Sequence, residues 1–342
     1  ADVAMATHWR RRLRAACGWA YDELSAAWYH LTRLLKLQSS GRLLLAVCLL
    51  AVLGLLSLVS AWSSMKGRTV VRKKTFSPAQ QLMMASSSGQ LSAVKRLLSA
   101  GVNFNHQDAT GKTALMMAAS GGKAAVVADL LAAGADPDMQ DTTGWTAVME
   151  AAGGGHDACL KLLIAAGASV NNKNKSGRTA LMGAAFGGFV GSVRVLVDSG
   201  ADPDLQDRDG WTALRWATKG SKPRVVQTLL ARGASPSITD FDGWPPLTAA
   251  ALEGHLHVVR ALIAGGARVN ARDEDGNTAL MTAAYKGHVE VVEALLGGGA
   301  HANLKDNQGR TAADWAREGS SEAGSAKKNR YQSVAAALAA GV

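Results

Sequence analysis

"GWTAVMEAA", at residues 144–152, is the phrase that decides the fold of this chain. "GRTALMGAA" follows at residues 177–185, and "GWTALRWAT" at residues 210–218. The phrase returns every 33 residues, and its glycine stands at Gly111, Gly144, Gly177, Gly210, Gly243, Gly276 and Gly309. A fixed period of this length predicts a stack of similar supersecondary units, because a single globular core does not repeat its sequence.

Each period of 33 residues predicts two short helices. A threonine two residues after the glycine can cap the first helix with its hydroxyl, at Thr113, Thr146, Thr179, Thr212, Thr278 and Thr311. A glycine-rich break ends that helix, and a second apolar run follows, such as "HVEVVEALL" at residues 288–296. The link "ADPDMQDTTG" at residues 135–144 is too polar for a core and rich in turn formers. Each unit is therefore helix, turn, helix and protruding turn.

This pattern resembles the ankyrin repeat, which has the same period and a helix opening similar to "TPLHxAA". The resemblance covers residues 78–342 and implies an all-α ankyrin-repeat solenoid of about eight 33-residue helix-turn-helix units with protruding turns. The usual proline after the threonine is alanine here, and Pro245 replaces one capping threonine. The family's histidine, a structural hydrogen-bonding residue, is replaced by Met116, Met149, Met182 and Met281, so we expect these turns to rely more on packing.

The two end units depart from the pattern. The first, from Pro78, lacks the glycine-threonine opening, and the last carries an insertion around "SSEAGSAKKN" before its second helix. Polar, irregular end units are expected because they cap a solenoid against water.

A different composition precedes residue 78. Arg42 and Lys66 bracket 23 residues without a charge, which is long enough to cross a hydrocarbon core of roughly 30 Å. We therefore expect a transmembrane helix with its flanks at residues 39–66. Its small residues Gly54, Ser57 and Ala61 share a face where a second transmembrane helix could pack, although small residues also occur there by chance.

The residues around the span carry most of the positive charge. Residues 1–38 predict a basic amphipathic helix, which could lie on a membrane, dock on a partner or be a targeting segment, and residues 67–77 predict a basic linker. Of the net charge of +10, residues 1–77 hold 12 Lys and Arg against 3 Asp and Glu, a balance of +9. This distribution favours membrane lipid head groups as a partner and disfavours nucleic acid, whose binders carry the charge on the folded domain.

The charges flanking the span also bear on topology. Five cations follow the span closely and three precede it, which places the repeats on the positive-inside face. We expect a single-pass membrane protein, with an organellar membrane (mitochondrial inner or thylakoid) favoured over the plasma membrane.

No group of residues predicts catalysis, a cofactor or a metal. His156, His255 and His288 share one repeat position, where the resemblance implies a structural role. An aspartate stands three residues before most of the repeat glycines and is typical of a turn residue: Asp108, Asp141, Asp207, Asp240, Asp273 and Asp306. Cys17, Cys48 and Cys159 are too scattered for a disulfide framework or a zinc site. We expect that the protein is not an enzyme.

The residues that vary between units predict the partner-binding surface. The resemblance implies that the residue after the repeat glycine meets the partner from the protruding turn, and here the candidates are Lys112, Trp145, Arg178, Trp211 and Trp244. Phe186 and Tyr285, at the end of the first helix, are implied to face the same concave groove. Tryptophan and arginine are enriched at interface hot spots, and exposed tryptophans are costly unless something covers them. The alternative is that each tryptophan packs on the neighbouring turn.

These observations favour a membrane-anchored scaffold for protein partners, such as an accessory subunit of a large membrane protein complex that also contacts lipid and other transmembrane helices. The alternative is a regulatory adaptor that recruits a soluble partner to the membrane. A subunit co-purifies in fixed ratio after detergent extraction, and an adaptor does not. A catalytic protein with a repeat appendage is disfavoured because no remaining stretch is long enough for a catalytic domain.

Overall fold

The chain divides into two parts, Ala1–Thr75 and Phe76–Val342, and the computed structural model describes residues 76–322 and 328–341. The predicted amphipathic helix, the predicted membrane span with Gly54, Ser57 and Ala61, and all but the last two residues of the predicted linker lie outside the described residues. Within the described residues, no helix is both long and apolar enough to span a bilayer.

Sixteen helices form eight successive pairs in the described part of the chain. The first helices of the pairs are α3 (Pro78–Ser88), α5 (Ala114–Ser120), α7 (Ala147–Gly153), α9 (Ala180–Gly187), α11 (Ala213–Lys219), α13 (Pro246–Glu253), α15 (Ala279–Lys286) and α17 (Ala312–Glu322). The second helices are α4 (Leu91–Ser99), α6 (Ala124–Ala132), α8 (Asp157–Ala165), α10 (Val190–Asp198), α12 (Pro223–Ala231), α14 (Leu256–Ala264), α16 (Val289–Gly297) and α18 (Lys328–Ala340). The prediction of about eight helix-turn-helix units is confirmed.

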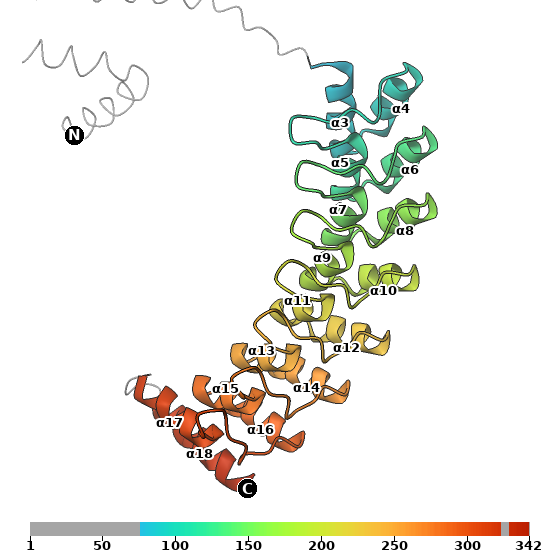
Figure 1. Cartoon of the computed structure of the whole chain (residues 1–342). Coiled ribbons are helices and arrows are strands. Elements are labelled where there is room, and N and C mark those ends of the chain that lie inside the picture. The colour runs from blue at the N-terminus through green and yellow to red at the C-terminus, as the bar shows by residue number, and fades with distance from the viewer. Residues whose placement is uncertain (1–75, 323–327, 342) are drawn as a thin grey trace, which may run out of the picture. The chain divides into compact units, whose positions relative to one another are not determined.

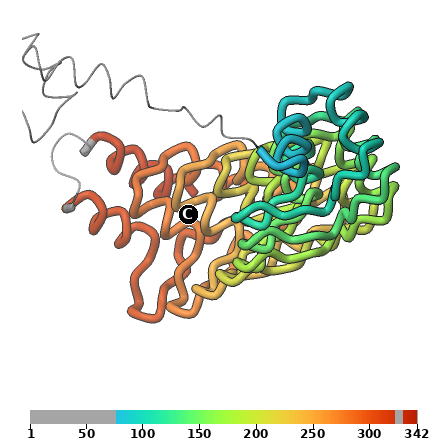
Figure 2. The backbone as a smooth tube through the Cα atoms, turned by 90° about the horizontal axis from the view of Figure 1, so that it is seen from above, coloured from blue at the N-terminus to red at the C-terminus, as the bar shows by residue number. Residues whose placement is uncertain are grey.

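The pairs stack in chain order, so that each first helix contacts the first helix of the next pair and each second helix contacts the next second helix. The first helices form an inner column, the second helices an outer column, and the hairpin turns project toward the inside of the bend of the stack (Figure 1). Seen from above, successive repeats are displaced stepwise from the blue end of the stack to the red end (Figure 2). The inner column and the hairpins together form one continuous face.

The inner helices are short and depend on caps and on neighbours. Thr146 accepts a hydrogen bond from the backbone N–H of Met149 at 3.4 Å. All six predicted threonine caps accept the backbone N–H of the residue three positions on in this way. Helices of seven or eight residues are not stable alone. Leu181, Ala184 and Ala185 show why the stack holds them, since each is at most 1% exposed between neighbouring repeats.

Two departures from the repeat pattern have visible consequences. Pro245 makes no side-chain cap, and α13 begins at Pro246, which needs no N–H partner at that position. The methionines are buried as expected, and the sulfur of Met182 also accepts the backbone N–H of Thr179 at 3.4 Å. Met281 makes the same contact with Thr278, so these methionines combine packing with a weak acceptor.

The aspartates shape the hairpins, as the sequence predicts. Asp141 accepts the backbone N–H groups of Thr143 at 2.8 Å and Trp145 at 2.9 Å, which closes the turn. Backbone hydrogen bonds connect adjacent hairpins: the N–H of Thr142, for example, donates to the carbonyl of Thr110 at 2.9 Å. Gly144 has a φ of +84°, and a Cβ there would lie 2.9 Å from the next hairpin's backbone at Lys175, so only glycine fits.

The histidine column is structural in two of its three members. His156 Nε2 lies 3.0 Å from the carbonyl oxygen of Ser120, and His288 Nε2 lies 3.1 Å from that of Leu252, each in the preceding repeat. Burial lowers the pKa of His288. His255 instead contacts the Glu253 carboxylate at 3.0 Å.

Candidate partner-binding surface

A hollow of about 360 Å³ opens between three consecutive inner helices, α7, α9 and α11. The large side chains that line it are Trp145, Met149, Met182, Phe186 and Trp216. Arg178 is the one charged residue among those that line it. The hollow therefore combines apolar walls with a single cation, which is the composition of a site that recognises a specific group.

The hollow exists because a side chain is missing from the middle repeat. Gly183 stands on α9 at the position held by Glu150 one repeat earlier and by Trp216 one repeat later. A Cβ on Gly183 would have no neighbour closer than Gly153, whose Cα lies 3.8 Å away. Gly153 and Gly183 on adjacent inner helices thus leave open a space next to a position that holds tryptophan in two other repeats, at Trp216 and Trp315.

Trp216 forms one wall, and sequence reasoning did not single it out. Its indole N–H donates to the Asp207 carboxylate at 2.9 Å, which fixes the ring. Phe186 meets it edge to face at 5.6 Å between ring centroids, and Trp211 packs against it at 4.8 Å. The available signal was that Trp216 is larger than the residue at this position in every repeat but the last, which has Trp315.

Arg178 lies on the rim of the hollow. Its Cζ atom is 4.1 Å from the centroid of the Trp216 ring, and its Nε atom is 3.9 Å from the nearest oxygen of Asp207. The side chain is 44% exposed. Stacking on an indole holds the guanidinium flat while leaving its N–H groups accessible.

A buried ion pair holds the Arg215 side chain against the Trp211 ring. Arg215 stands where most other repeats have methionine, and its Nε atom lies 3.3 Å from the Asp240 carboxylate of the next repeat. Its Cζ atom lies 4.2 Å from the centroid of the Trp211 ring. Both partners are buried, so removing either one would leave an uncompensated charge.

The structure brings together part of the predicted site. Trp145, Arg178 and Phe186 line the hollow, and Trp211 adjoins it through Trp216. The prediction that three tryptophans stand on exposed turns needs correction, because Trp145, Trp211 and Trp244 are all partly buried. The Trp145 ring packs against the core and the Trp211 ring against Trp216, while Trp145 also lines the hollow, so packing and a place on the binding surface are not exclusive.

Besides Trp211, three predicted residues do not line the hollow. Lys112 pairs with Glu150 at 2.7 Å, and this hydrogen bond raises the pKa of Lys112. Trp244 belongs to a later hairpin, and Tyr285 on α15 meets Trp315 edge to face at 5.6 Å. These residues line the same inner column but do not join the cluster around Trp216.

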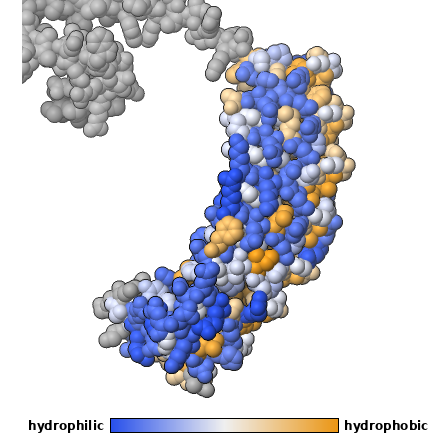
Figure 3. Space-filling view, viewed as in Figure 1, coloured by the Kyte–Doolittle hydropathy of each residue, from blue (hydrophilic) through white to orange (hydrophobic). Residues whose placement is uncertain are grey.

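One exposed aromatic residue was missed altogether. Phe241 is 71% exposed at the tip of a hairpin, where other repeats carry small, polar or charged residues. The face seen in Figure 3 is hydrophilic over much of its area, with apolar residues along the edge on the side of the second helices and in a few patches near the middle of the stack. An exposed aromatic outside the hollow is useful as a control for variants inside it.

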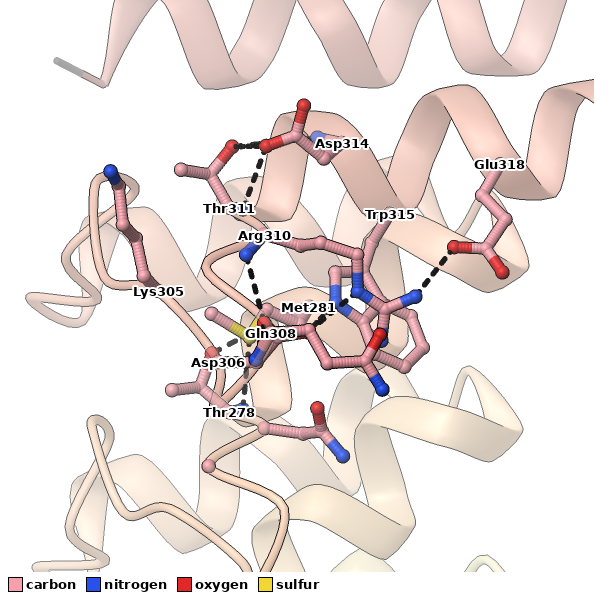
Figure 4. Close-up of polar contacts among 12 residues, drawn as sticks. Thr278, Met281, Lys305, Asp306, Gln308, Arg310, Thr311, Asp314, Trp315 and Glu318 are labelled. Atoms are coloured by element: carbon pink, nitrogen blue, oxygen red, sulfur yellow. Dashed lines mark hydrogen bonds and ion pairs between the residues drawn. The ribbon is translucent and has the colours of Figure 1, made fainter.

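The last repeat contains a filled version of the same arrangement (Figure 4). Arg310 donates to Asp306 at 2.8 Å and to Glu318 at 2.9 Å, and its Cζ atom lies 4.3 Å from the centroid of the Trp315 ring. The Trp315 indole donates to the same Asp306 carboxylate at 2.9 Å.

The filled arrangement perturbs the titration of Asp306. Burial alone would raise its pKa, but hydrogen bonds from the backbone N–H of Arg310, the Trp315 indole, the Arg310 side chain and the backbone N–H of Gln308 lower the pKa from 3.8 to about 2. Asp306 is therefore ionised at neutral pH and acts as a structural acceptor.

Groups suited to other chemistry are sparse in the described residues. Across residues 76–322 and 328–341, no three His, Cys, Asp or Glu side chains gather as a metal site. Cys159 is buried in α8, and burial raises the pKa of its thiol, which disfavours reactivity.

Comparison with known families gives one result. The family model described as ankyrin repeats (3 copies) matches six overlapping segments: residues 82–174, 124–207, 155–240, 190–273, 214–306 and 247–324. A comparison with curated proteins finds no match.

Proposed function

This chain belongs to the ankyrin-repeat family, and on that premise we propose that it is a membrane-anchored scaffold holding a protein partner on the inner face of its repeats. Ankyrin repeats are protein-interaction modules and are in general not catalytic. The proposal adds to that general role a particular contact site, the hollow between α7, α9 and α11, and an anchor in the N-terminal part.

The composition of the hollow supports the contact site. Phe186 is 49% exposed and Arg178 is 44% exposed, although both stand beside a large aromatic cluster. Exposed aromatic and arginine side chains that converge on one concavity are typical of interface hot spots. A partner that covers them removes apolar surface from water, which is the main source of binding free energy.

The anchor is supported by the sequence alone. The 23 uncharged residues between Arg42 and Lys66 match a membrane span, and the cations around them suit anionic lipid. In this role the protein is an accessory subunit of a membrane complex, and the adaptor alternative differs from it in having no fixed stoichiometry.

The contact site is tested by changing two residues on its wall. The full chain with Trp145→Ala and Phe186→Ala, extracted in mild detergent, should lose at least about thirtyfold in affinity for its partner. Phe241→Ala is the control, because it removes an exposed aromatic residue that lies outside the hollow. Full partner recovery with the double variant, at unchanged helix content, would contradict the proposed site.

The anchor is tested by deleting residues 43–62. The deleted chain should leave carbonate-washed membranes and remain folded. If it stays in the membrane pellet, the span is not the anchor. A constant molar ratio of chain to partner across purifications supports a subunit, and a variable ratio supports an adaptor.

A further inference from the structure

Arg178 and Arg310 occupy the same position in repeats that lie four periods apart. Each stands one residue after the repeat glycine, on the hairpin that leads into an inner helix. The two arginines therefore start from equivalent backbone, and differences in their surroundings come from the side chains that each repeat supplies.

Arg310 finds all its partners inside its own repeat. Asp306 precedes it by four residues, Trp315 follows by five and Glu318 by eight, and the guanidinium contacts all three side chains (Figure 4). Trp315 and Glu318 lie one helical turn apart on α17 and so project on the same face. The last repeat thus combines an aromatic ring and a carboxylate against one arginine.

Arg178 lacks those partners within its own repeat. The corresponding positions hold Asn174, Gly183 and Phe186, so the aspartate, the indole and the glutamate are all absent. The guanidinium stacks on Trp216 of the next repeat, and its Nε atom lies 3.9 Å from the buried Asp207 carboxylate, also of the next repeat. The guanidinium donates no hydrogen bond to any residue that the structure describes, so its N–H groups remain available to a further carboxylate. Its five N–H donors form a fork that matches a carboxylate.

We propose that the hollow binds a helical segment of the partner carrying a tryptophan and, three residues later, a glutamate. The tryptophan occupies the space that Gly183 leaves open, and the glutamate pairs with Arg178. The partner thereby supplies in trans what Trp315 and Glu318 supply to Arg310 within the chain. This inference rests on the proposed function and specifies the chemistry of the partner.

Charge and size both support this occupant. Arg178 is the one charge on the lining, so a carboxylate is the complementary group, and the walls of Trp145, Phe186 and Trp216 favour an aromatic ring. The pairing of Lys112 with Glu150 and of Lys219 with Glu253 leaves those nearby charges already neutralised. Arg178 has only a long ion pair, 3.9 Å to Asp207, and is thus the cation best placed to select a partner.

The test uses three alanine-based helical peptides with the full chain in mild detergent. One peptide carries Trp and Glu three residues apart, the second carries Trp and Gln, and the third carries Ala and Glu. We expect the Trp/Glu peptide to bind about tenfold more tightly than the Trp/Gln peptide, because one charge-assisted pair is lost. The Ala/Glu peptide should bind more weakly still.

Two variants at equivalent positions supply the control. Arg178→Gln should abolish the preference for Glu over Gln, whereas Arg310→Gln should leave that preference intact. If Arg310→Gln unfolds α17, Glu318→Gln serves as a second control, because it removes only one contact from the filled repeat. Equal affinities of the Trp/Glu and Trp/Gln peptides, or no binding of the Trp/Glu peptide at about 1 mM, would overturn the proposal, as would equal effects of the two arginine variants.

The peptide test and the partner test can fail separately. If the peptides fail but Trp145→Ala with Phe186→Ala still releases the natural partner, the scaffold role stands and this occupant is wrong. If the double variant retains its partner, the proposed contact site itself is wrong.

Discussion

The fourth repeat and the last repeat differ in what surrounds one arginine. Around Arg310 an aspartate, a tryptophan and a glutamate fill the space, while around Arg178 the same positions are Asn174, Gly183 and Phe186. The backbone is nevertheless the same, because threonine caps and buried leucines fix the fold in both repeats. The comparison shows that the side-chain positions around this arginine can be left unfilled in one repeat without loss of the repeat fold.

The largest expected effect compares the acceptors of the two sites. Asp306→Ala should cost about 3–5 kcal/mol, because it leaves the Arg310 guanidinium and the Trp315 N–H without their buried acceptor. Asn174→Ala should cost about 1–2 kcal/mol, since it removes a neutral acceptor from two backbone N–H groups. Urea unfolding measures both, and equal costs would mean that the two sites are equally filled.

The two arginines should differ in how much they contribute to the stability of the fold. Arg310→Gln should cost about 1.5–3 kcal/mol, because its side chain is only 30% exposed and donates to a buried carboxylate. Arg178→Gln should cost under about 1 kcal/mol, since its guanidinium is more exposed and makes only a stacking contact and a long ion pair. A thermal melt of each variant checks the order, and a larger loss for Arg178→Gln would contradict it.

Acid should weaken the filled site selectively. The pKa of Asp306 is lowered from 3.8 to about 2 in the folded state, so its stabilising contribution is complete above about pH 4 and is lost as the pH falls toward about 2. The linked change is on the order of 2 kcal/mol. Asp306→Asn should reduce the dependence of the urea unfolding midpoint on pH in this window. Part of that dependence should remain, because the pKa values of Asp108 and Asp141 are also lowered. If the slope of the urea midpoint against pH is unchanged in this variant, ionisation of Asp306 does not stabilise the fold.

The smallest expected effect concerns the empty position itself. Gly183→Ala should stabilise the chain by about 0.5–1 kcal/mol, because alanine is the better helix former and its Cβ meets nothing closer than 3.8 Å. The methyl group leaves most of the hollow open, so partner affinity should not change. Destabilisation in a thermal melt would indicate that the helix is packed more tightly at Gly183 than its contacts imply.

The fold was predictable because its signals are local and repeated. The period of 33, the capping role of Thr146 and the turn role of Asp141 all follow from residues close together in sequence. Trp145, Arg178 and Phe186 were predictable as candidates because they vary where the repeat varies. Their convergence on one hollow could not be foreseen from any one repeat.

The missed residues share one physical reason. Trp216 and Arg215 lie inside the repeated phrase, which indicates a helix but does not indicate what these two side chains contact. The carboxylates that they contact, Asp207 and Asp240, lie in hairpins outside that phrase. The hollow depends on a side chain that Gly183 lacks and on walls from three repeats. The predicted span and amphipathic helix before residue 76 remain predictions.

The most direct measurement compares Gly183→Trp with Gly183→Ala in partner binding. Tryptophan already occupies this helical position as Trp216 and Trp315, so the variant should fold and close the hollow from within. We expect Gly183→Ala to retain the partner in mild detergent, and Gly183→Trp to lose at least about thirtyfold in affinity with no fall in melting temperature. A folded Gly183→Trp chain that holds its partner as tightly as Gly183→Ala would contradict the claim that the partner binds in this hollow.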